Sequence, residues 1–161
     1  MSLDADIAIG AIAAKISRIE GLYAGFAQKQ GVSYALVQVL YELRLNSPVT
    51  QKQISQKCKI PKQTVNGIAK QLRAGKLIAV AAGKEDRREK GMKPTELGEA
   101  YIEETLKPFL ELNRAVVDKI GMDLLRQLSG GLDTVGDAIE LEMELKKISS
   151  RWEEGAKNAI P

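Results

Sequence analysis

Residues 50–77 read TQKQISQKCKIPKQTVNGIAKQLRAGKL and contain two short helical patterns separated by very few residues. Thr50 and Gln53 form a capping-box pair, in which each side chain bonds the backbone N–H of the other, so a helix is predicted to begin after Thr50. Pro61 suits the first turn of a second helix, because its missing N–H is not needed there. Gly75 is predicted to end that helix at the left-handed C′ position. Two helices joined by so tight a turn predict a helix-turn-helix.

The apolar residues of the second helix indicate which of its faces is turned inward. They recur at helical spacing and are Val65, Ile68, Ala69 and Leu72. The opposite face carries amide, hydroxyl and ammonium groups, which are the groups that bond base edges in the major groove. We expect five of these residues to contact DNA: Lys62, Gln63, Thr64, Asn66 and Lys70. The alternative is a solvated helix face without a ligand.

Charge is distributed unevenly along the chain. Between Thr50 and Thr95 there are twelve Lys or Arg residues and three Asp or Glu residues, a balance of +9, so the remainder carries −6 of the total of +3. A basic middle segment of this kind fits a surface that faces a polyanion. Residues 77–80 are apolar and partly β-branched, and a charged run from Gly83 to Gly91 follows them, which predicts a hairpin whose return strand lies around Met92.

Helical patterns flank this segment on both sides. The first thirty residues carry apolar side chains every three or four positions, Gly31 is predicted to end that helix, and Ser33 to cap the next one. Downstream, Thr95 is a predicted N-cap for a long helix that Pro108 should kink. Gly121 allows a reversal into a last helix. The predicted fold class is therefore mainly α with a small hairpin.

The run DRREKGMKPTELG at residues 86–98 resembles the wing signature of the MarR family of multiple-antibiotic-resistance-type regulators, in which Asp, any residue and Arg precede a strand and a Leu-Thr pair. The helix-turn-helix and the order of helices resemble the same family over nearly the whole chain. Two positions depart from the pattern. Pro94 stands where Leu is commoner, and Gly67 occupies a recognition-helix position that is often polar or basic.

The resemblance implies a winged helix-turn-helix with a two- or three-stranded β-wing and with N- and C-terminal dimerisation helices. It implies a homodimer on a palindrome whose half-sites lie roughly 10 bp apart. The wing residues then expected to contact DNA are Lys84, Arg87, Arg88 and Lys90. By the same analogy Arg87 or Arg88 enters the minor groove, and Asp86 orients an arginine through a charge-assisted hydrogen bond.

In domain terms we expect one MarR-like domain over residues 1–161. Its winged lobe would span 33–95, its dimerisation helices 4–30 and 96–148, and its tail 149–161. Trp152 in that tail has no assigned role.

The resemblance also suggests a small aromatic ligand, held in a cavity between the dimerisation helices and the winged lobe. The aromatic residues that we consider for such a cavity are Tyr23, Phe26, Tyr34, Tyr41 and Tyr101. Core packing is the alternative for each of them, because apolar stripes at helical spacing usually form core. The role of Cys58 as a redox switch is the weaker hypothesis, since its spacing from Ile54 predicts an inward position.

Composition excludes several classes of chemistry. The chain has no histidine and one cysteine, so it has no internal disulfide and no Ser-His-Asp or Cys-His triad, and a structural zinc site is not expected. It contains no phosphate-loop motif. We therefore expect no enzyme activity, no catalytic or metal-binding residues and no cofactor. No apolar run reaches the length of a membrane span, and no signal peptide is evident, so a cytoplasmic protein without membrane contact is expected.

The primary hypothesis is a sequence-specific regulator of transcription that binds double-stranded DNA as a homodimeric repressor and is released by a small molecule. The alternative is a winged-helix protein-interaction module that does not bind DNA. The balance of +9 favours DNA, because a module of the second kind has no need for a cation-rich recognition face.

Overall fold

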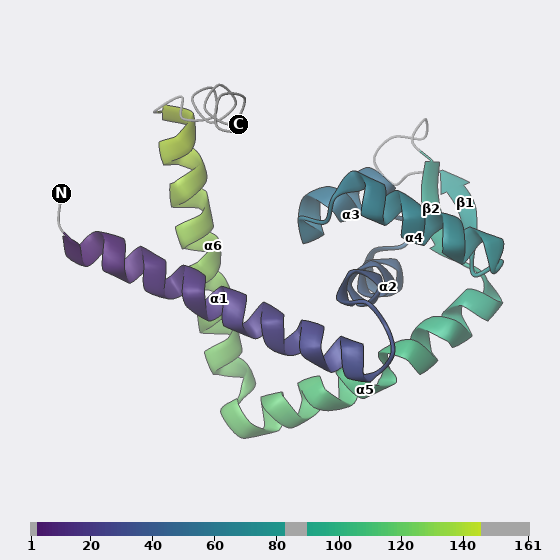
Figure 1. The fold of residues 1–161 in the computed structure, drawn as a ribbon, viewed down its shortest axis with the longest axis horizontal. Helices are drawn as coiled ribbons and strands as arrows, with labels where there is room; N and C mark the ends of the chain where they lie inside the picture. Colours follow the sequence, from purple (N-terminus) through teal and green to yellow (C-terminus); the bar gives the residue numbers. More distant parts are fainter. Residues whose placement is uncertain (1–2, 83–89, 146–161) are drawn as a thin grey trace, which may run out of the picture. The chain divides into compact units, whose positions relative to one another are not determined.

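The computed structural model describes residues 3–82 and 90–145, which form helices and one two-stranded antiparallel sheet (Figure 1). In chain order the elements are α1 (Leu3–Lys29), α2 (Tyr34–Asn46), α3 (Gln51–Cys58), α4 (Lys62–Ala74), β1 (Ile78–Ala82), β2 (Lys90–Pro94), α5 (Glu96–Ile120) and α6 (Met122–Leu145). The chain divides into two compact units, and the boundary falls inside α5, between Pro108 and Phe109. This is the predicted fold class, a mainly α winged helix.

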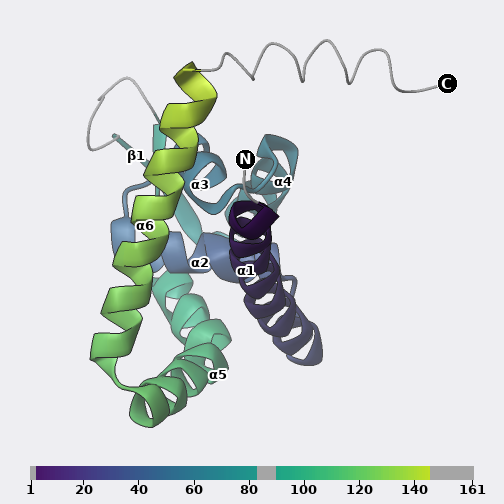
Figure 2. The same ribbon diagram turned by 90° about the vertical axis from the view of Figure 1, so that its left-hand side faces the viewer.

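In the first unit, α2 is the central helix, and α3 and α4 lie across it (Figure 2). The side chains that fill this interior are almost fully buried. They include Val37, Leu40 and Leu43 of α2, Ile54 of α3 and Val65 of α4. Because all three helices contribute apolar side chains to one core, the orientation of α4 is fixed by its packing on α2 and α3.

The predicted helix starts are confirmed by their capping bonds. The Leu36 N–H donates to Ser33 Oγ at 3.1 Å, which caps α2. At α3 the capping box is complete, since the Gln53 N–H donates to Thr50 Oγ1 at 3.1 Å and the Thr50 N–H donates to Gln53 Oε1 at 2.8 Å. Both caps are local, so the sequence alone indicates them.

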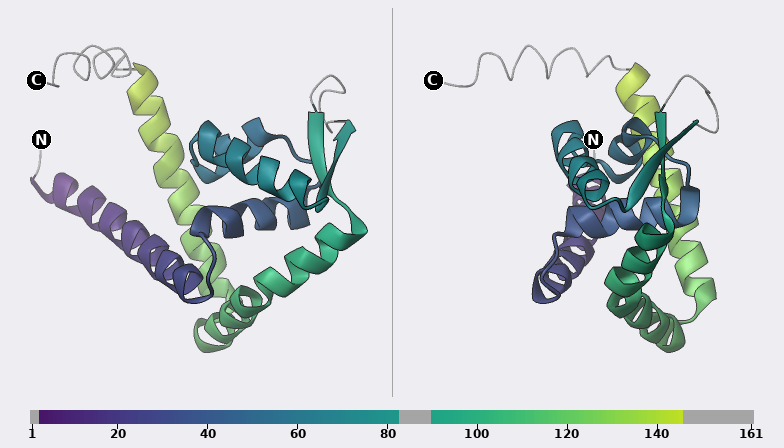
Figure 3. Two further views of the ribbon diagram at one scale, coloured as in Figure 1. Left: turned by 45° about the vertical axis from the view of Figure 1, so that its right-hand side comes forward. Right: turned by 90° about the vertical axis from the view of Figure 1, so that its right-hand side faces the viewer.

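The wing is an antiparallel hairpin in which Val80 pairs with Met92 and Ile78 with Pro94. Its two strands lie side by side next to the end of α4 (Figure 3). A third segment joins the sheet through one residue, because the Val49 N–H donates to the Met92 carbonyl at 3.0 Å and the Met92 N–H donates to the Val49 carbonyl at 2.8 Å. In the described residues, the position of a third strand is thus held by a single bridge between Val49 and Met92.

The end of α4 differs from the prediction by one residue. Gly75 has an ordinary φ of −75°, and the left-handed residue is Lys76, with φ 57°. The Lys76 N–H donates to the Arg73 carbonyl at 2.9 Å and the Leu77 N–H to the Leu72 carbonyl at 2.8 Å. This pair of bonds is a Schellman motif, which requires the left-handed residue at C′. The prediction of Gly75 at C′ is therefore wrong, because Gly75 is the C-cap of α4 and the left-handed C′ residue is Lys76.

Thr95 joins the wing to α5. Its Oγ1 accepts from the Gly98 N–H at 3.0 Å, which confirms the predicted N-cap, and donates to the Lys76 carbonyl at 2.8 Å. Its N–H donates to the Leu77 carbonyl at 3.0 Å. The backbone of Leu77 lies so close to Gly98 that a β-carbon there would overlap the Leu77 carbonyl oxygen. The chain leaving α4 and the chain entering α5 are therefore in direct contact.

The second unit contains the end of α5 and all of α6 that is described. The helix α5 continues through Pro108, which has no N–H to bond the Glu104 carbonyl. The boundary between the two units lies immediately after this residue. The chain turns at Gly121, whose φ of 78° is in the left-handed region that glycine adopts without strain. The predicted reversal at this residue is confirmed.

Candidate functional site

The helix α4 presents one buried and one exposed face. Val65, Ile68, Ala69 and Leu72 are buried, as their spacing predicts. All five residues of α4 that are predicted to contact DNA lie on its exposed side: Lys62, Gln63, Thr64, Asn66 and Lys70. The structure thus brings these polar side chains together on one helix surface, and their contact with DNA stays a prediction.

The surface around α4 is cationic because its sequence contains no acid. From Thr50 to Gly83 there is no Asp or Glu. Among the described residues, nine exposed cations lie on α3, α4, β2 and the adjoining turns: Lys52, Lys57, Lys59, Lys62, Lys70, Arg73, Lys76, Lys90 and Lys93. Charges of one sign at this density raise the local potential and attract anions.

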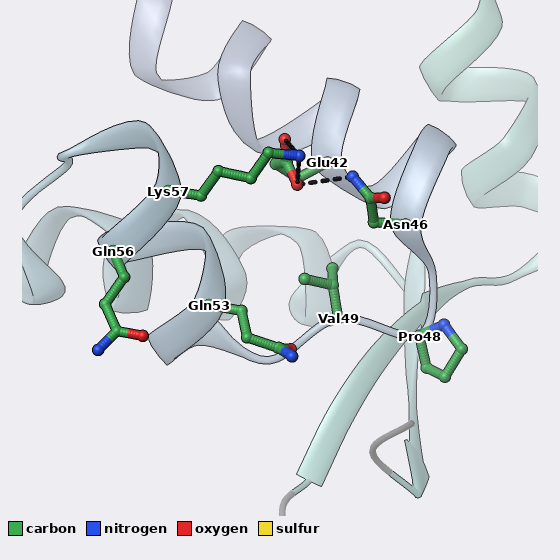
Figure 4. A pocket seen from close by; sticks show the side chains of 7 residues that line it. All are labelled: Glu42, Asn46, Pro48, Val49, Gln53, Gln56 and Lys57. Carbon is green, nitrogen blue, oxygen red and sulfur yellow. Dashed lines mark hydrogen bonds and ion pairs between the residues drawn. The ribbon is translucent and has the colours of Figure 1, made fainter. Parts of the chain in front are cut away.

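Lys57 is an exception, since it is turned toward α2. Its Nζ lies 2.8 Å from Glu42 Oε1 and 3.1 Å from Glu42 Oε2, and Asn46 Nδ2 donates to the same Oε2 at 2.8 Å (Figure 4). Glu42 is only 8% exposed, so its carboxylate depends on these two partners. The three residues line a groove of about 530 Å³ between α2 and α3, together with Gln53. The charge of Lys57, which contributes to the sequence balance of +9, is therefore compensated within the fold.

Both ends of α4 are flanked by a lysine in the left-handed region. Lys59, before the helix, has φ 53°, and Lys76, after it, has φ 57°. An L-residue with a β-carbon is strained in this conformation by roughly 1–2 kcal/mol, which glycine avoids. Lysine is thus present at two positions where glycine would be more stable.

The tip of the wing lies outside the described residues. It contains four of the predicted DNA-contact or orienting residues: Lys84, Asp86, Arg87 and Arg88. Lys90 is described, and it is exposed at the start of β2.

A second cavity of about 620 Å³ lies between α1, α2 and the turn that precedes α4. Its lining includes Glu20, Tyr34, Cys58 and Thr64. The Tyr34 ring stacks on Tyr23, with centroids 6.1 Å apart and planes inclined by 26°. Of the aromatic residues considered from the sequence, Tyr34 lines this cavity and Tyr23 supports it.

Two groups at this cavity have shifted proton affinities. Burial raises the pKa of the Tyr34 hydroxyl, and the Glu20 carboxylate adds to the rise. Burial also raises the pKa of the Cys58 thiol, and the Glu42 carboxylate acts in the same direction. Cys58 is half-buried rather than fully inward as its spacing predicts. A raised pKa keeps this thiol protonated, and the protonated form is the unreactive one.

Large apolar side chains are exposed on α1 and on α6. On α1, Ile19 is 56% exposed and Leu22 is 63% exposed, and on α6, Leu128 is 53% exposed. The other such residues on these two helices are Leu3, Ile7, Ile9, Ile16, Met122, Leu124, Leu132, Ile139, Leu141 and Met143. Apolar surface of this extent indicates an interaction surface on each helix.

No helix within residues 3–82 and 90–145 is both long and apolar enough to cross a membrane. In the same residues no three acidic or cysteine side chains gather in a way that would hold a metal ion.

Comparison with known proteins agrees with this geometry. A model of the MarR family matches residues 29–89. The structure of NMB1585, a MarR family regulator from Neisseria meningitidis, is similar with a TM-score of 0.74 and 29% identity over 86% of this chain and 97% of that one. No match is found among curated proteins.

Two more distant structures share the fold. The transcriptional regulator BldR from Sulfolobus solfataricus has a TM-score of 0.64 and 18% identity over 86% of this chain and 99% of that one. CouR from Rhodococcus jostii, solved with p-coumaroyl-CoA, has a TM-score of 0.64 and 19% identity over 77% of this chain and 90% of that one. The winged helix, the wing sequence and the family match over residues 29–89 agree with one another, and the chain resembles the MarR family of transcriptional regulators over most of its length.

Proposed function

We propose that the protein binds double-stranded DNA sequence-specifically through α4 and the wing, and represses transcription as a homodimer on a palindromic operator. The observation that carries this proposal is the polar, exposed face of α4 within a segment that has no acidic residue from Thr50 to Gly83. An α-helix fits the major groove, where amide and ammonium side chains distinguish the base pairs. The surrounding lysines supply the salt-dependent attraction to phosphates.

The exposed apolar residues of α1 and α6 support the homodimer. Each helix leaves side chains such as Leu22 and Leu128 largely in solvent, and a second copy would bury them. The helical glycines Gly25 and Gly136 have no atom within 4 Å of the position that a β-carbon would take, which leaves room for close helix packing. A two-fold dimer would place two copies of α4 about one turn of DNA apart, as a palindrome requires.

We also propose that a small aromatic ligand releases the protein from DNA by occupying the cavity at Tyr34. This cavity is lined both by Tyr34 of α2 and by Thr64 in the first turn of α4, so an occupant would contact the recognition helix itself. The complex of CouR with p-coumaroyl-CoA supports an aromatic acyl compound as the class. A ligand with a higher affinity for one position of α4 shifts the population toward it.

The decisive experiment for DNA binding is selection of bound fragments from a random DNA library by the purified protein. Recovery of an inverted repeat with half-sites roughly 10 bp apart is the expected result. Sedimentation equilibrium of the complex should give two chains per repeat. If no sequence is enriched at low salt, the proposal is wrong and the protein-interaction module becomes the better hypothesis.

The wing assignment has its own test. Replacing both Arg87 and Arg88 with alanine should weaken operator binding and reduce the slope of log affinity against log salt by up to about two contacts. An unchanged slope would contradict a role of these arginines in binding. Replacing Lys57 with alanine is the matched control, because Glu42 already compensates this charge and the slope should stay the same.

The ligand proposal is tested by thermal unfolding in the presence of phenolic acids and their thioesters. A binding compound should raise the midpoint of the wild-type protein and lower its operator affinity, and Tyr34→Ala should reduce both effects. A panel in which no compound raises the midpoint would count against the ligand without affecting the proposal of DNA binding.

A further inference from the structure

We infer that Gly67 sets how closely the backbone of α4 approaches the base pairs, which makes it a specificity-determining residue of the recognition helix. The inference rests on the proposed binding of DNA by α4. It concerns the shape of the helix surface, whereas the residues proposed above act through their polar groups.

Gly67 lies on the outward face of α4. The helix turns by about 100° per residue, and Val65, Ile68 and Leu72 mark the side that is buried. The positions opposite that side are Gln63, Gly67, Lys70 and Ala74, all of which are exposed. The outward face of the helix thus has a glycine near its middle, between the long polar side chains of Gln63 and Lys70.

The fold gives no reason for glycine at this position. No heavy atom lies within 4 Å of the point where a β-carbon of residue 67 would stand, and its φ is not in the left-handed region. Glycine is the poorest helix former after proline, so it weakens α4 without improving its packing. Gly98 provides the contrast, because there a β-carbon would overlap the Leu77 carbonyl.

The missing side chain has a direct consequence in a groove. The major groove is about as wide as an α-helix with its side chains, so the residues on the outward face limit how deep the helix can sit. With glycine there, the backbone of α4 can come against the base edges, and the side chains of Gln63 and Asn66 need to reach less far. A side chain at residue 67 would hold the helix away from the bases.

The test compares Gly67→Ala and Gly67→Leu with the wild-type protein on the selected operator and on random DNA at the same salt concentration. We expect operator affinity to fall by about tenfold or more for leucine and less for alanine, in the range of a lost base contact. Affinity for random DNA should stay within about twofold, because that mode uses phosphates alone. The thermal midpoint of Gly67→Ala should rise, since alanine favours the helix.

The matched control is Ala100→Leu, which adds a leucine at an exposed position of α5 in the same unit and should leave operator affinity unchanged. Three results would overturn the inference. The first is that the Gly67 variants bind the operator with the same affinity as the wild-type protein, and the second is that they lose as much affinity for random DNA as for the operator. The third is a thermal midpoint of Gly67→Ala below that of the wild-type protein. If the wild-type protein itself selects no sequence, the proposed function fails and this inference with it. If the wild-type protein selects a clear operator and the Gly67 variants bind it with unchanged affinity, this inference is refuted and the proposed function is not.

Discussion

Replacing Gly98 with alanine should separate α4 and its wing from the start of α5. The new methyl group would overlap the Leu77 carbonyl oxygen and would lie 2.8 Å from the Leu77 carbonyl carbon. Both obstacles are backbone atoms, so no side-chain rotation can relieve the overlap. Either α5 or the segment after α4 must therefore move.

The size of the effect follows from the bonds that this movement breaks. The Thr95 N–H bond to the Leu77 carbonyl and the Thr95 Oγ1 bond to the Lys76 carbonyl each contribute about 1 kcal/mol. The overlap itself adds roughly 1–3 kcal/mol, and the better helix propensity of alanine returns about 1 kcal/mol. The free energy of unfolding should fall by about 2–4 kcal/mol.

Urea unfolding followed by far-ultraviolet circular dichroism measures this change. The expected midpoint shift is about 1 M or more, given the slopes usual for chains of this size. Gly67→Ala is the matched comparison, because the same chemical change at an open position should stabilise the protein. A free energy of unfolding for Gly98→Ala within about 0.5 kcal/mol of the wild-type value would refute the close approach at Leu77.

Three further changes test other parts of the first unit. Lys76→Gly should raise the free energy of unfolding by about 1 kcal/mol, because glycine relieves the left-handed strain, and should lower the salt slope of DNA binding by about one contact. If thermal unfolding and salt titrations show neither effect, the strain at Lys76 and its contact with DNA are both contradicted. Iodoacetamide should alkylate Cys58 more slowly at neutral pH than it alkylates glutathione, and the rate should rise as pH approaches the raised pKa of the thiol. Equal rates for the two thiols would contradict the claim that burial raises the pKa of Cys58. Glu42→Ala should lower the free energy of unfolding, measured in urea, by about 1–3 kcal/mol, since Asn46 and Lys57 lose their common acceptor, and Glu42→Gln should lower it by less. If Glu42→Ala leaves this free energy unchanged, the bonds of Glu42 to Asn46 and Lys57 do not stabilise the fold.

The features that the sequence predicts well are those encoded by residues three or four apart. The caps at Ser33, Thr50 and Thr95 and the inward face of α4 are of this kind, and the structure has them where they are expected. The exposed polar face of α4 follows from the same periodicity, which is why the candidate contact residues could be named without the structure.

The features that the sequence does not predict depend on contacts between distant residues. Nothing local indicates that Lys57 turns to Glu42, which lies fifteen positions earlier. The left-handed conformation of Lys76 depends on the chain continuing into the wing, and glycine at the preceding position gave a misleading signal. A lysine in an otherwise basic segment therefore cannot be assigned to the DNA side from charge alone.

The pairing of Val49 with Met92 is a second reason, besides the loss of α2 from the core, why the chain cannot be shortened to begin at Thr50. Any fragment that begins at Thr50 keeps both helices of the helix-turn-helix, but it strips β2 of the backbone partners that Val49 supplies at 3.0 and 2.8 Å. A strand with a newly opened edge pairs readily with other chains, which leads to aggregation. An isolated recognition module suitable for expression must therefore retain the residues immediately before the capping box.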